Sequence, residues 1–251
     1  MVSCLGLVDH KAQKMWVFDA TPDLKTQTKW LSDQLNPNEF KLPDGIFLTH
    51  GHIGHYTGLM YLGKESMGTS KVPVYAMPKM EKFLKTSGPW SQLVNIDNIT
   101  LQSLTSDSTI ILSPDVSVIP VSVPHRGEYT ETVGFKILGP EKKVLFIPDI
   151  DKWHLWEKSI NEEIQEVDYA FLDGSFFKNG EVGNRDMSEI PHPFVEESMN
   201  TFDDLPLAER NKVHFIHFNH TNPLLKKESE AYSEVYSKGY KVAEEKSIIA
   251  L

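Results

Sequence analysis

Three of the ten histidines in this 251-residue chain, His50, His52 and His55, fall within six positions. The apolar run 46–48 before them predicts the end of a buried strand, and the two glycines among the histidines allow a sharp turn. We therefore expect the first two imidazoles to project to one side and the third to return from the first turn of a helix. Neutral imidazoles are common ligands of zinc and related cations. The spacing predicts a metal site rather than a proton relay.

Polar side chains that can bind metals also follow several other predicted strands. They are His125, Asp149, Asp173, and His217 or His220. Because strands of one sheet tend to end at one edge, residues far apart in the sequence can meet there. The recurrence predicts one shared site more strongly than any single motif does.

Composition excludes several classes of protein. A net charge of −10 argues against a broad nucleic-acid-binding or anionic-membrane surface. No apolar run reaches the length of a membrane span, and no signal peptide is visible, so the expected location is the cytoplasm. Cys4 is the single cysteine, which rules out an intrachain disulfide and a cysteine-rich zinc site.

The apolar patterning predicts alternating strands and helices. Residues 99–124 predict an antiparallel meander, and the polar segment 177–190 predicts a loop near the site. The other predicted strands are 2–7, 15–19, 72–75, 132–138, 143–147, 167–172, 213–218 and one near 248–249. The main predicted helices are 24–35, 55–62, 78–85, 194–200, 206–210 and 222–238.

The stretch from Thr49 to His55 resembles the His-x-His-x-Asp-His signature of the metallo-β-lactamase superfamily. Gly54 stands where that family usually has an aspartate that binds a second metal. The resemblance implies an α/β fold of the α+β kind, an αββα sandwich of two mixed sheets flanked by helices. We expect residues 1–251 to form a single domain of this type, compatible with a missing amino-terminal segment.

The resemblance also implies ligands for one or two divalent metal ions, with zinc expected and manganese or iron as alternatives. His50, His52 and His125 match one site, Asp149 matches the bridging aspartate, and His55 with His217 matches the second site. His217 is favoured over His220 because it lies on the opposite strand face from Phe218, whereas His220 follows the strand. His220 remains a substitute ligand. Asp151 is the lesser alternative to Asp149, and His214 is predicted to be structural.

Further segments narrow the resemblance to the pyrroloquinoline quinone biosynthesis protein B family. Two departures stand out: the cysteine-bearing amino-terminal segment is absent, and the first metal motif carries more histidines. The matching segments are 19–23, 57–59, 125–128, 132–134, 147–151, 173–176, 217–219 and 221–223.

The resemblance implies a hydrolase that uses a metal-bound hydroxide on an ester or phosphodiester-type bond of a small-molecule or peptide-derived substrate. Asp173 and His192 resemble the carboxylate–histidine pair that protonates leaving groups; alternatively Asp173 caps a turn and His192 starts a helix. Arg126 is a candidate for binding an anionic substrate or for a surface ion pair. The alternatives are an iron-dependent oxidoreductase in quinone-cofactor maturation and a metal-bound carrier without turnover. A homodimer is compatible with the sequence.

Overall fold

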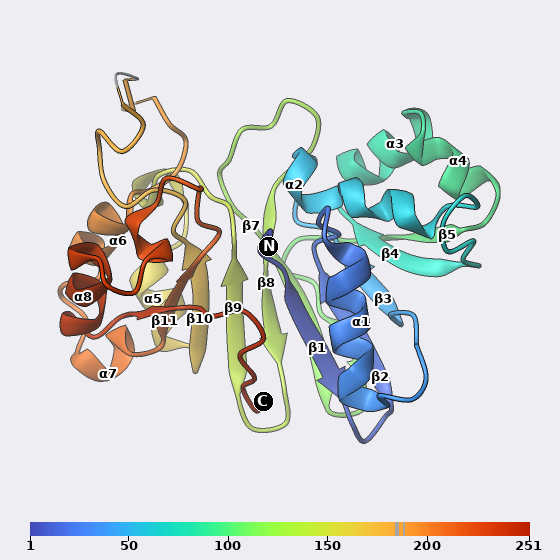
Figure 1. The fold of residues 1–251 in the computed structure, drawn as a ribbon, viewed down its shortest axis with the longest axis horizontal. Helices are drawn as coiled ribbons and strands as arrows, with labels where there is room; N and C mark the ends of the chain where they lie inside the picture. Colours follow the sequence, from blue (N-terminus) through green and yellow to red (C-terminus); the bar gives the residue numbers. More distant parts are fainter. Residues whose placement is uncertain (184–185, 188) are drawn as a thin grey trace. The chain divides into compact units, whose positions relative to one another are not determined.

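The computed structural model describes residues 1–183, 186–187 and 189–251. These residues form two compact units, Met1–Ser108 with Gly127–Val133, and Thr109–Arg126 with Gly134–Leu251. We call them unit 1 and unit 2 and describe each by itself. The expected class is confirmed, since the chain holds two mixed β-sheets flanked by helices (Figure 1).

Unit 1 contains a five-stranded sheet in the order β1-β2-β3-β4-β5. The first two strands form an antiparallel hairpin, and the remaining neighbours pair in parallel. The parallel strands β2 and β3 place the loops after them at one edge of the sheet. The strands are β1 Leu5–Asp9, β2 Lys14–Phe18, β3 Gly45–Phe47, β4 Val72–Ala76 and β5 Ile99–Ser103.

Helix α1 (Leu24–Leu35) has the predicted bounds. Its buried residues are Leu24, Thr28 and Ser32, and Leu31 packs against the apolar cluster that contains Leu24. The other helices of unit 1 are α2 Ile53–Tyr56, the 3₁₀ helix η1 Thr57–Leu62, α3 Pro78–Thr86 and α4 Trp90–Asn95.

Unit 2 contains a seven-stranded sheet in the order β12-β11-β10-β9-β8-β7-β6. Its central strands β9, β10 and β11 run parallel, so their carboxyl ends lie at one edge. Strands β8 and β9, both predicted, pair antiparallel as a hairpin. The strands are β6 Ile110–Ser113, β7 Val116–Ser122, β8 Val133–Leu138, β9 Lys143–Ile147, β10 Tyr169–Asp173, β11 Val213–Ile216 and β12 Lys241–Val242.

The predicted meander over residues 99–124 is wrong in its first part. Strands β6 and β7 do pair antiparallel, but β5 pairs in parallel with β4 in the sheet of unit 1. The last strand is also misplaced: it is β12, whereas Ile248 in the predicted segment is 77% exposed. Both errors arise because an apolar run does not identify its own pairing partner.

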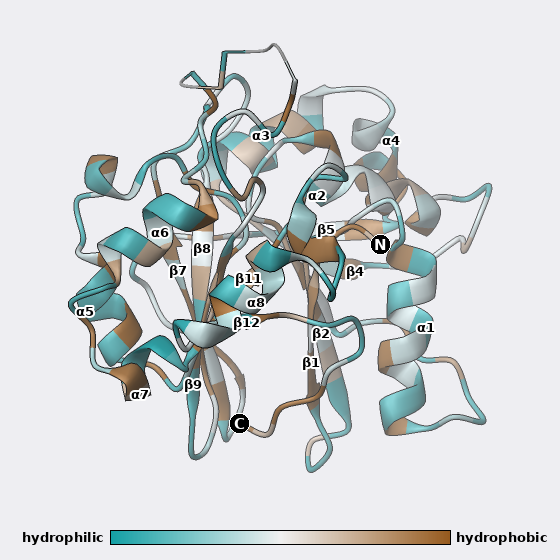
Figure 2. Cartoon of the chain, turned by 60° about the vertical axis from the view of Figure 1, so that its left-hand side comes forward, coloured by the Kyte–Doolittle hydropathy of each residue, from teal (hydrophilic) through white to brown (hydrophobic). Residues whose placement is uncertain are grey.

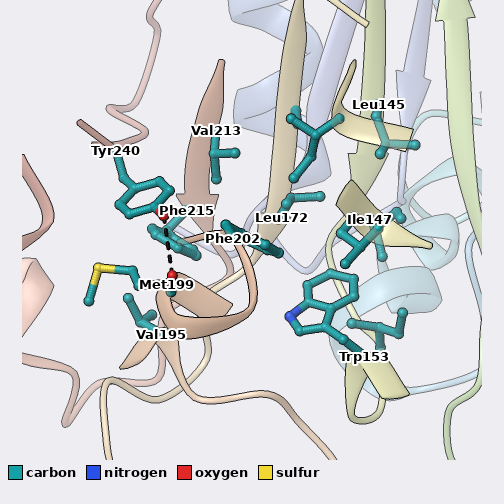
Figure 3. Close-up of a cluster of buried hydrophobic side chains, with 14 of the residues drawn as sticks. Leu145, Ile147, Trp153, Leu172, Val195, Met199, Phe202, Val213, Phe215 and Tyr240 are labelled. Atoms are coloured by element: carbon teal, nitrogen blue, oxygen red, sulfur yellow. Dashed lines mark hydrogen bonds between the residues drawn. The ribbon is translucent and has the colours of Figure 1, made fainter. Parts of the chain in front are cut away.

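Helices of unit 2 pack on an apolar cluster that includes Trp153, Phe202 and Phe215 (Figure 3). The Tyr240 hydroxyl in this cluster donates to the Met199 carbonyl at 3.3 Å (Figure 3). The helices are η2 Trp153–Leu155, α5 Ile160–Gln165, α6 Val195–Thr201, α7 Leu207–Arg210, η3 Pro223–Leu225 and α8 Glu230–Ser237. The predicted helix 222–238 is therefore two separate pieces.

The predicted loop 177–190 contains no helix or strand among its described residues, and positions 184, 185 and 188 lie outside them. Met187 and Ile190 from this segment are buried against Phe194. Hydrophilic and hydrophobic residues alternate along helices such as α1 (Figure 2). Within the described part of the chain, every helix is too short or too polar to cross a membrane.

Candidate metal centre

The histidine-rich loop of unit 1 follows β3 and leads into α2. Gly51 N donates to Thr130 Oγ1 at 2.8 Å, and a Cβ built at Gly51 would lie 2.8 Å from the Thr130 methyl group. Glycine is therefore needed for this close approach. A Cβ at Gly58 would lie only 2.0 Å from the Thr21 carbonyl oxygen. The two glycines let the loop and the 3₁₀ helix pack tightly around the histidines.

The imidazole rings of His50 and His52 are in contact, with a distance of 2.8 Å from His50 Nε2 to His52 Nδ1. The remaining nitrogen of each ring has an oxygen partner. His50 Nδ1 lies 2.9 Å from Thr49 Oγ1, and His52 Nε2 lies 3.2 Å from a carboxylate oxygen of Glu128. This arrangement directs one nitrogen of each ring toward the other ring, as two ligands of one cation would be directed.

Asp19, at the end of β2, organises the same loop from the protein interior. Its carboxylate is fully buried and accepts from Thr49 N at 2.9 Å and from Thr49 Oγ1 at 2.8 Å. The other oxygen lies 2.7 Å from His55 Nδ1. Asp19 has a left-handed φ of 71°, which turns the chain sharply after the strand. One carboxylate thus fixes His55 directly and His50 through a hydroxyl.

In unit 2, the ends of β9, β10 and β11 bring a second set of side chains together. Asp149 follows β9, Asp173 ends β10 and His217 follows β11. Each of these residues and His192 offers one ligand atom, and these four atoms lie within 4.8 Å of one another. Parallel neighbouring strands explain the convergence. His50, by contrast, follows β3, a strand of the five-stranded sheet.

Asp149 lies at the middle of this second set. Its Oδ1 is 3.3 Å from His125 Nε2 and 3.1 Å from His192 Nδ1, and its Oδ2 is 3.8 Å from His217 Nε2. The His125 side chain is fully buried and the Asp149 side chain is 4% exposed. A buried carboxylate among imidazoles is a donor set that suits zinc, manganese or iron(II).

His192 and Asp173 form the closest pair, with His192 Nδ1 2.7 Å from Asp173 Oδ2. Burial alone would lower the pKa of His192, but the charge of Asp173, the hydrogen bond to it and the charge of Asp149 together raise the pKa to about 9. The positive charge of Arg126 opposes that rise. In the metal-free protein His192 is therefore protonated at neutral pH.

Three other candidates from the sequence remain to be placed. His220 is exposed and, among the described residues, does not belong to the cluster of metal-competent side chains at Asp149. His214 packs against the rings of Tyr169 and Phe171, and burial lowers its pKa to about 4, as expected for a structural histidine. Arg126 is exposed at the end of the segment that follows β7.

Sequence reasoning did not assign a role to Asp19, Thr49, Glu128 or Ser175. A signal existed for Asp19, since it directly follows the apolar strand β2, much as Asp149 follows β9. The roles of the other three depend on contacts that no spacing displays.

A family model described as a beta-lactamase superfamily domain matches residues 15–218. The chain belongs to the β-lactamase superfamily. The match extends from β2 to the residues after β11 and includes both sets of histidines and carboxylates. The predicted superfamily resemblance is therefore confirmed.

The resemblance to the B-protein family is also confirmed. Coenzyme PQQ synthesis protein B of Xanthomonas oryzae pv. oryzae (strain MAFF 311018) is 24% identical, with 94% of this chain and 83% of that protein aligned. The crystal structure of Zn²⁺-bound PqqB from Methylobacterium extorquens has a TM-score of 0.79 at 21% identity, and covers 99% of this chain and 87% of that one. The short form of human tRNase Z has a TM-score of 0.62 at 16% identity, covering 99% and 92%. At these identities the structures show a shared fold.

Proposed function

We propose that this protein is a metal-dependent hydrolase of ester or phosphodiester-type bonds. The observation that carries the proposal is the convergence of Asp149, Asp173, His192 and His217, each with one N or O atom within 4.8 Å of the others, which puts two candidate metal ligands beside a carboxylate–histidine pair. The fold shared with a zinc-bound PqqB and a tRNase Z supports it. Zinc is the proposed ion, with manganese and iron as alternatives.

The proposed ligands are the metal-competent side chains named from the sequence. In unit 1 they are His50, His52 and His55; in unit 2 they are His125, Asp149 and His217, with His220 as a substitute. A bound divalent ion would supply Lewis acidity, polarising the scissile bond and making water acidic enough to attack near neutral pH.

We assign the role of general acid to His192. Its Nδ1–H is held by Asp173, so the proton on Nε2 is the one available to a leaving group. The same hydrogen bond and the charges of two carboxylates keep the ring protonated. Arg126 remains the candidate for binding an anionic group of the substrate, since its positive charge acts on the acid. The substrate itself is proposed to be a small molecule or peptide-derived.

The first experiment measures metal content per chain in protein purified without added metal or chelator. A content of about two zinc or manganese ions per chain would support the hydrolase. It would also show that a second metal ion binds although Gly54 stands in place of the usual aspartate. About one iron ion without hydrolytic activity would favour the iron-dependent oxidoreductase. Absence of metal, before and after reconstitution, would rule out both enzymes.

The second experiment tests the acid with two phosphodiesters, one with a nitrophenolate leaving group and one with an alkoxide leaving group. An alkoxide needs protonation far more than nitrophenolate does. We expect His192→Gln to lower kcat about 100-fold or more on the alkyl ester and much less on the nitrophenyl ester, with metal retained. His154→Gln, at an exposed position in η2, is the matched control. Equal losses on both substrates would contradict the assignment.

A further inference from the structure

Ser175, in the turn after β10, is buried and contacts three site residues through its hydroxyl. Its Oγ lies 2.8 Å from Asp173 Oδ1, 2.8 Å from His217 Nδ1 and 3.3 Å from His192 Nδ1. Only 4% of the residue is exposed. A hydroxyl in such a position has one proton to donate and two lone pairs that accept.

The carboxylate fixes the direction of these hydrogen bonds. Asp173 can only accept, so the single proton of Ser175 Oγ is directed to it. The hydroxyl oxygen then accepts from Nδ1–H of His217. A neutral His217 with its proton on Nδ1 has its lone pair on Nε2, the atom that lies 3.8 Å from Asp149. The network therefore selects the tautomer that can bind a metal through Nε2.

The same arrangement occurs in unit 1 with different residues. Thr49 Oγ1 lies 2.8 Å from Asp19 Oδ1 and 2.9 Å from His50 Nδ1. His55 Nδ1 bonds directly to the other oxygen of Asp19, as His192 Nδ1 bonds to the other oxygen of Asp173. In both units the carboxylate also accepts from the backbone N–H of the hydroxyl-bearing residue, at 2.9 Å.

We propose that Thr49 and Ser175 are positioning residues, each placing the proton of one histidine on Nδ1 so that Nε2 is left for a metal ion. The part of this inference that concerns metal binding rests on the proposed function. The part that concerns the histidine tautomers does not, because it follows from hydrogen bonds present in the metal-free protein.

The backbone around Ser175 is held independently of its hydroxyl. Gly174 N donates to Ile216 O at 2.9 Å, Asn219 N donates to Ser175 O at 2.9 Å, and the buried side chain of Asn222 donates to Gly174 O at 2.7 Å. A Cβ at Gly174 would meet Phe218 at 2.9 Å, so the two loops pack closely. Removing the hydroxyl should therefore leave the loops in place.

The test uses Ser175→Ala and Thr49→Val, which remove the hydroxyl with little change in volume. Two matched controls remove buried hydroxyls that do not contact a histidine. Ser198→Ala acts in unit 2, where Ser198 Oγ accepts from Trp153 Nε1. Thr69→Val acts in unit 1, where Thr69 Oγ1 lies within hydrogen-bond distance of two carbonyl oxygens, 3.0 Å from that of Leu62 and 2.9 Å from that of Asn98. Ser175→Thr, which restores a hydroxyl, tests rescue.

The first readout is ¹⁵N NMR of the histidine side chains in metal-free protein, above the pH at which His217 and His50 bind a proton. We expect the wild type to show Nδ1–H on both, Ser175→Ala to lose this preference at His217 alone, and Thr49→Val at His50 alone. The second readout is zinc affinity by competition with a chelator, which should fall about 10- to 100-fold in each variant and remain unchanged in the controls.

Unchanged tautomers and unchanged zinc affinity in both variants would overturn the proposal. Should Ser175→Ala fail to fold, Ser175→Cys keeps the volume with a much weaker acceptor and should show the same loss at His217. If the wild type binds no zinc while the tautomers shift as expected, the proposed function fails and the positioning role stands.

Discussion

The two units hold their histidines with the same connections but recruit them from the chain in different ways. In each, one buried carboxylate bonds one histidine directly and a second histidine through a hydroxyl. Unit 1 takes its histidines from a single loop, whereas unit 2 takes its site residues from the ends of parallel strands and from the segment before α6. The comparison teaches that orientation of the imidazole rings, rather than spacing in the sequence, is the common element.

The largest expected effect follows from removing either carboxylate. Asp19→Ala and Asp173→Ala each leave several buried donors without an acceptor, and should destabilise the protein by about 3 to 5 kcal/mol. Urea denaturation of metal-free protein measures this loss. Asp33→Ala, which removes a partly exposed ion pair with Lys29 within α1, is the control and should cost less than about 1 kcal/mol. A similar cost for all three would show that the carboxylates do not hold the clusters.

The pH dependence of stability separates two histidines of unit 2. The pKa of His192 is raised to about 9, so its contribution is fully present below about pH 6.5, the value expected in the unfolded chain, and is lost as pH rises through about 9. The loss should be on the order of 3 kcal/mol relative to His192→Gln in metal-free protein.

His214 should behave in the opposite sense. Its pKa is lowered to about 4, so its contribution is complete above about pH 6.5 and is lost as pH falls toward 4. Denaturation of wild type, His192→Gln and His214→Gln from pH 4 to 10 measures both effects. If the pH dependence of wild type and His192→Gln were the same above pH 6.5, the buried ion pair would be contradicted.

The carboxylate–hydroxyl arrangement that unit 1 shares with unit 2 does not include His52. Its Nε2 instead lies beside the half-exposed carboxylate of Glu128. Glu128→Gln removes the charge beside His52 Nε2 and should weaken zinc binding about tenfold, at the low end for such a contact. Glu131→Gln, on the same segment but bonded to Lys79 N, is the control. A loss of zinc affinity as large as that caused by Thr49→Val would show that Glu128 contributes as much to zinc binding as the buried hydroxyl of Thr49 does.

The smallest effect on stability is expected at Gly54. A Cβ there would meet only Val2, at an ordinary distance of 3.7 Å, so Gly54→Asp should change the free energy of unfolding by less than about 0.5 kcal/mol. The metal content per chain should rise if the added carboxylate restores the superfamily's usual ligand. A large destabilisation would show that the glycine is required by the backbone.

Much of the fold and part of the site could be predicted from the sequence. Apolar runs of strand length located most strands, and polar residues after them identified Asp149, Asp173 and His217. The pairing of β5 could not be predicted, since a parallel partner is not encoded in the strand itself. The proposed roles of Thr49 and Ser175 could not be predicted, because a hydroxyl can orient a histidine ring in this way only when a carboxylate lies beside it in the folded protein. For Thr49 that carboxylate belongs to Asp19, 30 residues earlier in the chain.

The shared carboxylates have a consequence for combinations of mutations. Since Asp19 acts on both His50 and His55, its loss already removes the support that Thr49 gives, and the double variant should be little worse than Asp19→Ala alone. Asp173→Ala and Ser175→Ala should likewise combine to a loss smaller than the sum of their separate effects. The residues concerned are Asp19, Thr49, His50 and His55 in unit 1, and Asp173, Ser175, His192 and His217 in unit 2. Within each group of four, we expect the effect of one substitution to depend on which of the other three residues have already changed.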